Sequence, residues 1–320
     1  MYETVERGAV RRYRAAERAL WSRCGLEPTE RFIDLDTPVV RLRVLEVGSG
    51  APVLFVHGTA GPGSLPFLIR ELGGLRCLVL DRPGWGLSTP IDFSRYEYKT
   101  VVADVLNGLL DALDVDRAEV VGASIGNVWA LRLAAGRPSR VDRMVLLGGA
   151  PLVREVRIPP FIRLLTTPIG ALVVRLPERP RITRMQLRQL GHGASLAAGR
   201  IPDEFIDWRT AMTRETSSMR NERAMVRTIA GPRGFRAGLV FEDDEFARIE
   251  QPTLYVYGTA DPVGTADVWR RVVGLMPKGE LRIMDGFGHA PWFDDASRIG
   301  SAISRFLATD GGDPTHPNQK

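Results

Sequence analysis

The chain has 320 residues, of which 44% are hydrophobic and 25% charged, a size and composition suited to one large α/β domain with an inserted subdomain. No segment reaches the roughly 18 consecutive apolar residues of a membrane span, and no apolar signal region follows the Arg-rich start, so we expect a cytoplasmic protein. The net charge of +5 comes almost wholly from arginines that are spread along the chain without a nucleic-acid-binding motif, which excludes nucleic acid as the expected partner.

Residues 1–35 are predicted to form an N-terminal helical extension. Tyr13, Leu20 and Cys24 recur at helical spacing with arginines between them, a pattern typical of an amphipathic helix. Cys24 and Cys77 both lie in segments of apolar periodicity. Two buried thiols are therefore a better interpretation than a disulfide.

Strands and helices alternate over residues 36–150 and 251–309, which predicts an α/β core. The alternation of Val40, Leu42 and Val44 with arginines predicts a half-exposed strand. Short apolar runs that end in Gly or Asp, typical of buried parallel strands, occur at 52–56, 77–80, 120–121, 144–147, 253–257 and 281–284. Amphipathic helices are predicted at 98–113, 125–137, 265–276 and 291–308. We expect a mostly parallel sheet with helices on both faces and a ligand site at the carboxyl ends of its strands.

Residues 151–250 interrupt this alternation, because they contain several helical stretches and no convincing strand. One of the predicted helices carries Phe205, Trp208 and Met212 on one face. A helical block between two sheet strands is predicted to form a cap over the active site. Residues 310–320 are polar, and we expect them to be disordered.

The segment Gly122-Ala123-Ser124-Ile125-Gly126 matches the G-x-S-x-G pattern of a nucleophile elbow. Ser124 follows a predicted strand and precedes a predicted helix, which is the context that the pattern requires. The glycines are needed because a serine on such a sharp turn has strained backbone angles, and side chains at the flanking positions would collide. Ser124 is therefore the predicted nucleophile, and it needs a base to take its proton.

With this motif in place, the chain resembles the α/β-hydrolase superfamily over roughly residues 39–307. The likeness is to the cap-bearing serine hydrolases, such as esterases and meta-cleavage-product hydrolases. The family's chain order is nucleophile, acid, histidine. Asp261, in Gly-Thr-Ala-Asp-Pro-Val, resembles the family's acid loop, and His289, in Gly-Phe-Gly-His-Ala-Pro-Trp, resembles its histidine loop.

The resemblance implies a catalytic triad of Ser124, His289 and Asp261. A histidine titrates near neutral pH and suits the role of base, while the aspartate would fix its tautomer and stabilise its positive charge. Some relatives carry their acid after the preceding sheet strand, where this chain has Gly-Gly-Ala and no carboxylate. Asp285 and Asp267 are the alternative acids.

The segment His57-Gly58-Thr59-Ala60-Gly61 resembles the family's oxyanion loop. An oxyanion hole needs backbone N–H groups aimed at the charge that develops on the carbonyl oxygen. The resemblance implies one N–H from Ile125, directly after the nucleophile, and the other from Thr59 or Ala60. His57 is interpreted as a structural anchor of this loop rather than a catalyst.

The sequence says less about the substrate. The candidates for an apolar substrate pocket, each of them alternatively a plain core residue, are Trp129, Phe205, Trp208, Met212 and Trp292. Between residues 151 and 241 there are 16 Arg against 7 Asp and Glu. That excess could attract an acidic substrate, and the alternatives are a solvated face or a homodimer contact.

The main functional prediction is hydrolysis of a carboxylic ester or lactone in a small apolar substrate, with no cofactor and no metal. The nearest competing enzyme class is a carbon–carbon bond hydrolase of the meta-cleavage-product type, but those enzymes typically carry Trp directly after the histidine, where this chain has Ala290 and places Trp292 two positions later. Haloalkane dehalogenases and epoxide hydrolases are excluded, because they have an aspartate in place of Ser124. A ligand receptor or a non-hydrolytic cyclase or lyase on the same scaffold remains the alternative from another class.

Overall fold

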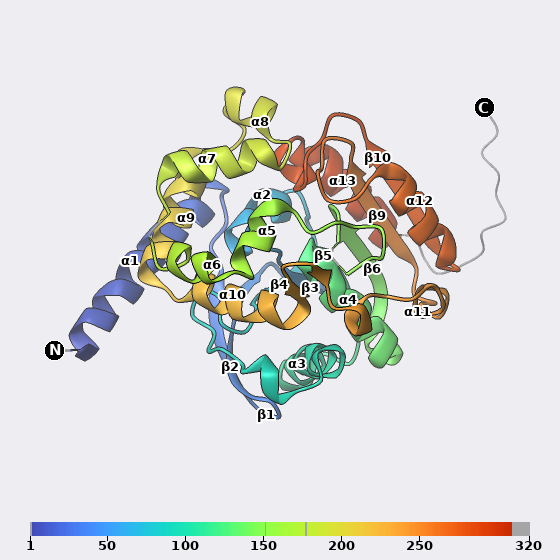
Figure 1. Cartoon of the computed structure of the whole chain (residues 1–320), viewed down its shortest axis with the longest axis horizontal. Helices are drawn as coiled ribbons and strands as arrows, with labels where there is room; N and C mark the ends of the chain where they lie inside the picture. The colour runs from blue at the N-terminus through green and yellow to red at the C-terminus, as the bar shows by residue number, and fades with distance from the viewer. Residues whose placement is uncertain (1, 151, 177, 309–320) are drawn as a thin grey trace.

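The computed structural model describes residues 2–150, 152–176 and 178–308 and is built around an eight-stranded sheet (Figure 1). The strand order is β1-β2-β4-β3-β5-β6-β9-β10. Neighbours are antiparallel where β2 meets β1 and β4, and parallel elsewhere. The strands are β1 (Thr29–Asp36), β2 (Val39–Val47), β3 (Ala51–Val56), β4 (Leu75–Asp81), β5 (Ala118–Ala123), β6 (Val141–Leu147), β9 (Thr253–Gly258) and β10 (Gly279–Met284). The predicted fold class is confirmed.

Helices cover both faces of the sheet, because buried strand residues alternate between its two sides. Leu54 and Val56 pack into one core with α3 and α4, whereas Val53 and Phe55 pack into the other with α1, α2 and α13. The helices that flank the sheet are α1 (Tyr2–Arg23), α2 (Pro66–Ile69), α3 (Tyr98–Ala112), α4 (Ile125–Gly136), α12 (Ala266–Leu275) and α13 (Ala296–Ala308). Within the described residues, no helix is both long and apolar enough to cross a bilayer.

Between β6 and β9 the chain forms a further group of helices, called here the inserted helices. They are α5 (Pro160–Leu165), α6 (Pro168–Val173), α7 (Pro180–Gln189), α8 (Gly193–Ala197), α9 (Asp203–Glu215) and α10 (Ser218–Ile229). A two-stranded hairpin, β7 (Ala230–Gly231) and β8 (Gly234–Phe235), and α11 (Asp243–Ala247) follow. The loops after β3 and β4 contact these helices. The carbonyl of Thr59 accepts a hydrogen bond from Arg209 of α9, and the carbonyl of Gly84 accepts one from Asn221 of α10. The inserted helices therefore lie at the carboxyl ends of the strands.

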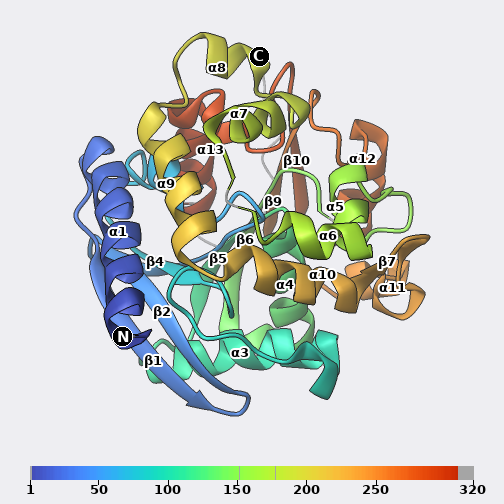
Figure 2. The ribbon, with the colours of Figure 1, turned by 60° about the vertical axis from the view of Figure 1, so that its left-hand side comes forward.

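The N-terminal helix α1 packs along α9, as Figures 1 and 2 both show. Arg12 and Glu215 form an ion pair of 2.7 Å between the two helices. Cys24 and Cys77 are free and buried, as predicted, and burial raises their pKa values to about 11 and about 12. Strand β1 was not predicted; all of it except Asp36 lies in the segment assigned to the helical extension.

Candidate active site

Ser124 occupies a strained turn between β5 and α4. Its backbone angles are φ 56° and ψ −118°, a conformation that a residue with a side chain rarely adopts. The neighbouring glycines allow this turn, because a Cβ on Gly122 would lie 2.8 Å from the backbone nitrogen of Asn127 and one on Gly126 would lie 2.7 Å from the carbonyl carbon of Val56. The turn therefore has the form that the G-x-S-x-G pattern predicts.

Asn127 ties this turn to the next strand. Its side-chain amide donates to the carbonyl oxygens of Gly148 (3.0 Å) and Leu147 (3.2 Å), and its side-chain oxygen accepts from the Leu147 N–H (3.2 Å). The backbone N–H of Ser124 also donates to Leu147, over 3.0 Å. These bonds fix the position of Ser124 against the end of β6. Asn127 was not predicted as a site residue, because an asparagine in a helix carries no signal of its own.

Asp261 and His289 form a direct hydrogen-bonded pair. Nδ1 of His289 lies 2.9 Å from each carboxylate oxygen of Asp261. The same two oxygens accept from the backbone N–H groups of Gly149 (2.7 Å) and Val263 (2.8 Å). Asp261 is only 4% exposed, so these donors replace water around its charge and orient the carboxylate toward the imidazole.

The histidine loop passes over the end of β6, next to the serine turn. Gly148 follows Leu147, the residue that accepts the Ser124 N–H, and it has a φ of 69°. A Cβ at Gly148 would lie 3.5 Å from Nδ1 of His289 and would collide with the carbonyl group of that residue. The three predicted triad residues are thus brought to one edge of the sheet from three separate loops.

The alternative acids have other partners. Asp285 accepts a hydrogen bond from the Thr259 hydroxyl (3.0 Å), and Asp267 pairs with Arg270 (2.6 Å) while its side chain is 91% exposed. Asp261 is therefore the acid whose contacts fit the predicted role.

The predicted oxyanion loop lies against the serine. A Cβ on Gly58 would lie 2.7 Å from the Cβ of Ser124, so the loop approaches as closely as a glycine allows. The carbonyl of Thr59, the next residue, accepts a hydrogen bond of 2.5 Å from Arg209. Ile125 begins α4, where backbone N–H groups lack helical acceptors and the helix dipole favours negative charge.

His57 is fully buried at the start of this loop. Its Nε2 accepts from the backbone N–H of Arg82 (3.2 Å), so the proton of the neutral ring is on Nδ1 and is donated to the carbonyl of Gly58 (2.7 Å). Burial lowers the pKa of His57 well below its usual value, and the charge of Arg82 adds to this effect. These contacts agree with the interpretation of His57 as a neutral structural anchor.

A cavity of about 530 Å³ extends from the oxyanion loop into the inserted helices. Thr59 and Ala60 line it together with aliphatic side chains from α5, α6 and α7, and the remaining wall includes polar side chains such as Gln186, Gln189 and Thr213. Its volume is in the usual range for a small-molecule site. Among the predicted pocket residues, Phe205 lines this cavity.

The other four predicted pocket residues are buried among other groups. Trp208 is fully buried against Gly61 and Gly63, behind the oxyanion loop. Met212 packs in the same core, and Trp129 packs on Phe93 on the opposite face of the sheet. The indole N–H of Trp292 donates to the carbonyl of Ser64 over 2.6 Å. The structure thus gives each of these four side chains a contact in the core.

An ion pair that sequence analysis did not foresee lies in the wall of the cavity. Nε of Arg209 is 3.3 Å from the carboxylate of Glu178, and both side chains are about nine-tenths buried. Glu178 also accepts from the Thr183 hydroxyl (2.9 Å). Because Arg209 holds the Thr59 carbonyl as well, it connects α9 and the segment before α7 to the oxyanion loop.

A buried histidine from the inserted helices supports the histidine loop. His192, between α7 and α8, lies 3.1 Å from the carboxylate of Asp294, which also accepts from the Ser195 hydroxyl and the Gly288 N–H. Burial alone would raise the pKa of Asp294, but the hydrogen bonds from His192 and Ser195 outweigh it and lower that pKa. His192 was not predicted as a functional residue.

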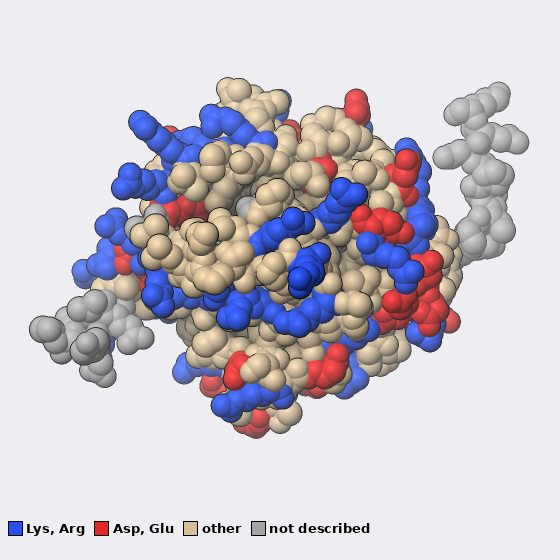
Figure 3. Space-filling view, viewed as in Figure 1, with Lys and Arg blue, Asp and Glu red and all other residues tan. Residues whose placement is uncertain are grey.

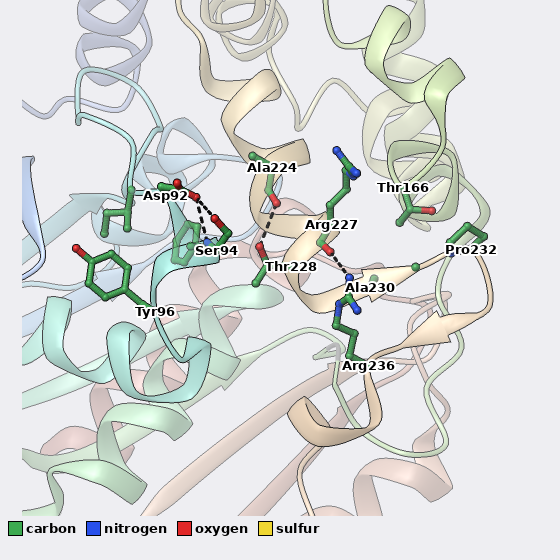
Figure 4. Close-up of a pocket in the computed structure, with 13 residues that line it drawn as sticks. Asp92, Ser94, Tyr96, Thr166, Ala224, Arg227, Thr228, Ala230, Pro232 and Arg236 are labelled. Carbon is green, nitrogen blue, oxygen red and sulfur yellow. Dashed lines mark hydrogen bonds between the residues drawn. The ribbon is translucent and has the colours of Figure 1, made fainter.

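A second cavity, of about 740 Å³, lies outside this site (Figure 4). It is formed by the loop around Asp92 and Tyr96, by α10 and by the β7–β8 hairpin. Asp92 caps its own loop through Ser94, and Arg236 donates to the carbonyl of Arg227, so these polar groups already have partners within the wall. Among the described residues, no cluster of three or more His, Cys, Asp or Glu side chains is arranged to hold a metal ion.

A family model described as alpha/beta hydrolase family matches residues 53–300. A 2-hydroxy-6-oxononadienedioate/2-hydroxy-6-oxononatrienedioate hydrolase of Paraburkholderia xenovorans (strain LB400) is 28% identical, over 84% of this chain and 91% of the relative. Among solved structures, carboxylesterase CesB of Bacillus subtilis has a TM-score of 0.71 at 17% identity, over 96% of this chain and all of that chain. A meta-cleavage product hydrolase of Pseudomonas fluorescens IP01 has a TM-score of 0.67 at 23% identity, over 84% of this chain and 94% of that chain. The chain therefore belongs to the alpha/beta hydrolase family.

Proposed function

We propose that the protein is a serine hydrolase that cleaves a carboxylic ester or lactone through an acyl-enzyme. The observation that carries the proposal is the Asp261–His289 pair, held at 2.9 Å, at the same edge of the sheet as the strained turn that carries Ser124. A serine hydroxyl is a weak nucleophile until a positioned base removes its proton, and this constellation supplies one.

In the proposed reaction, His289 takes the proton of Ser124 while the serine oxygen attacks the carbonyl carbon. Asp261 keeps Nδ1 of the imidazole protonated, so that Nε2 is free to act as the base, and it stabilises the imidazolium that forms. Backbone N–H groups of Ile125 and of Thr59 or Ala60 donate to the oxyanion. His289 then returns the proton to the leaving alkoxide, and it activates the water that releases the acyl group from the serine.

The aliphatic cavity supports a small, mostly apolar substrate. Its wall reaches from Thr59 and Ala60 into the inserted helices, so one part of the substrate would lie among aliphatic side chains while its carbonyl group meets the oxyanion loop. In this proposal residues 151–250 form the cap of the site, residues 36–150 and 251–309 form the catalytic core, and residues 1–35 pack on the cap through α1.

The second candidate is hydrolysis of a carbon–carbon bond, because relatives of this chain are named as 2-hydroxy-6-oxononadienedioate hydrolases. Against it stands the residue after His289, which is Ala290 where such enzymes carry a tryptophan. Trp292 is a poor substitute, since its indole N–H is bound to the Ser64 carbonyl and its side chain is buried. This difference favours the ester or lactone.

The two candidates are separated by turnover. We expect the purified protein to hydrolyse p-nitrophenyl esters or an acyl lactone, and to leave 2-hydroxy-6-oxononadienedioate unchanged, with all activity lost in Ser124→Ala. Faster cleavage of the dienedioate than of every ester would favour the carbon–carbon hydrolase. Saturable binding of these compounds without multiple turnover would contradict both and point to a receptor or cyclase.

A further inference from the structure

Exposed large hydrophobic side chains are concentrated on the inserted helices. Among the described residues nine such side chains are exposed, and seven of them lie between residues 164 and 185. Six of these, called here the apolar patch, are Leu164, Ile169, Leu172, Val173, Leu176 and Ile182. Ile169 is 65% exposed, and Leu172 and Leu176 are each 62% exposed. A grouping of this kind on a protein surface marks an interaction site more often than chance exposure.

The apolar patch is continuous with the cavity of the candidate site. Four residues are exposed to solvent and also line the cavity that Thr59 lines: Leu164, Val173, Leu176 and Ile182. An apolar molecule that leaves this surface would therefore meet a largely apolar wall inside the cavity that Thr59 and Ala60 also line.

Arginines border the same surface. Figure 3 shows Lys and Arg side chains around the tan surface over α6. Arg163 and Arg175 belong to the segment that carries the patch, and Arg223 of α10 donates to the carbonyl of Thr167, at the start of α6 (3.1 Å). Desolvation lowers the pKa of Arg223, and the positive charges of Arg227 and Arg175 lower it further.

The positive charge of this surface is not balanced locally. Six of the seven carboxylates between residues 151 and 241 pair with other arginines: Glu155, Glu178, Asp203, Glu204, Glu215 and Glu222. No carboxylate in the part of the chain that the structure describes comes within ion-pair distance of Arg163, Arg175, Arg223 or Arg227. An occupant of this face must therefore offer apolar groups and negative charge together.

We propose that this face binds the protein to an anionic lipid surface, and that the substrate enters the cavity from that surface. The aliphatic side chains of the patch enter the boundary between head groups and acyl chains, while the bordering arginines meet the lipid phosphates. The affinity of such binding rises with the apolar area buried and with the number of cations near the surface. Only entry of the substrate rests on the proposed hydrolysis; binding to lipid does not.

A second copy of this chain fits the face less well. A two-fold symmetric contact would place the same surface of both copies together, so unpaired arginines would face unpaired arginines across a dehydrated interface. An anionic bilayer instead neutralises them.

The test is flotation of the Ser124→Ala protein with vesicles, so that catalysis plays no part. Vesicles of phosphatidylcholine alone are compared with vesicles that also contain phosphatidylglycerol, at low and high salt. We expect binding to the mixed vesicles, weakened by salt. The double variant Ile169→Gln with Leu172→Gln should lower the partition coefficient roughly tenfold or more, and Arg175→Gln should lower it about fivefold.

Matched controls come from surfaces elsewhere on the chain. Val39→Gln replaces a side chain that is 81% exposed on the β1–β2 hairpin, and Arg11→Gln removes an exposed charge of α1; both should bind as the parent does. Equal binding to the two vesicle types, or no binding to either, would overturn the proposal. A dimer seen by light scattering would also overturn the proposal if the double variant Ile169→Gln with Leu172→Gln were monomeric. The apolar patch would then join two copies of the chain.

Discussion

The backbone N–H of Ala290 donates a hydrogen bond of 3.0 Å to Nε2 of His192. This bond requires an unprotonated Nε2, so the proton of the neutral ring sits on Nδ1, which faces the carboxylate of Asp294. Ala290 directly follows His289, whose own N–H donates to the carbonyl of Leu190 (2.8 Å). The end of α7 therefore holds the predicted catalytic histidine in place from the side of the inserted helices.

Replacing His192 tests this support. His192→Leu leaves the Ala290 N–H and the Asp294 carboxylate without their buried partner, which should lower the free energy of unfolding by about 1–3 kcal/mol and lower kcat for a p-nitrophenyl ester. His192→Gln offers an oxygen to Ala290 and an amide to Asp294, so it should recover most of kcat. A purely structural role would instead leave kcat of the folded His192→Leu protein equal to that of the wild type.

Asp261→Asn should lower kcat by roughly 10⁴-fold, because an amide no longer stabilises the imidazolium or keeps the productive tautomer of His289. The alternative acids supply matched controls. Asp267→Asn and Asp285→Asn alter exposed carboxylates bound to Arg270 and Thr259, and both proteins should keep the activity of the wild type. Esterase kinetics on the three variants distinguish the acids, and a loss in Asp285→Asn equal to that in Asp261→Asn would contradict this assignment.

Gly58→Ala should disturb the oxyanion loop. The added methyl group would lie 2.7 Å from the Cβ of Ser124 and 2.8 Å from the carbonyl oxygen of Ala123, so the loop has to move. We expect a loss of about 10²-fold or more in kcat, similar to removal of one oxyanion donor. Gly73→Ala, whose new methyl group meets only open space, is the control and should change neither kcat nor stability. Equal activity of the two variants would show that this loop does not hold the oxyanion.

His57 should make the folded state sensitive to acid. The pKa of His57 is lowered in the folded protein, whereas in the unfolded chain His57 takes up its proton near pH 6.5. The folded state therefore gains its full stability from neutral His57 above pH 6.5 and loses that stability as the pH falls below it. The expected loss is at most about 1.4 kcal/mol per pH unit. Urea unfolding at pH 7.5 and 5.5 measures it, and the pH dependence should be smaller in His57→Gln. The same dependence in both proteins would mean that His57 is not the group responsible.

The residues of the site that could be predicted are those with a local signal. Ser124 lies in a turn whose neighbours must be glycines, and Asp261 lies in a loop directly after a buried strand, so a few adjacent residues carry the information. Most sheet strands were predictable for the same reason, since β3, β4, β5, β6, β9 and β10 are short apolar runs and β2 alternates apolar residues with arginines. Strand β1 lacks such a run because Glu30 and Asp34 interrupt it, and it is defined by its pairing with β2.

The remaining features depend on contacts between distant segments. Helical spacing correctly groups Phe205, Trp208 and Met212 on the buried side of α9, but it does not show which of them meets a cavity and which packs behind the oxyanion loop. His192 binds Ala290 and Arg209 binds Thr59, and both partners lie far away in the sequence. No local sequence pattern around His192 or Arg209 indicates these contacts. Packing of the inserted helices on the sheet decides these contacts.

The proposed mechanism depends most directly on Ser124, and one measurement tests it: intact mass after incubation with a fluorophosphonate probe, for the wild type and for Ser124→Ala, alongside turnover of a p-nitrophenyl ester. We predict one covalent adduct on the wild type, none on Ser124→Ala, and ester turnover by the wild type alone. A wild-type protein that stays unlabelled, or a Ser124→Ala protein that is labelled equally, would contradict the assignment of Ser124 as the nucleophile.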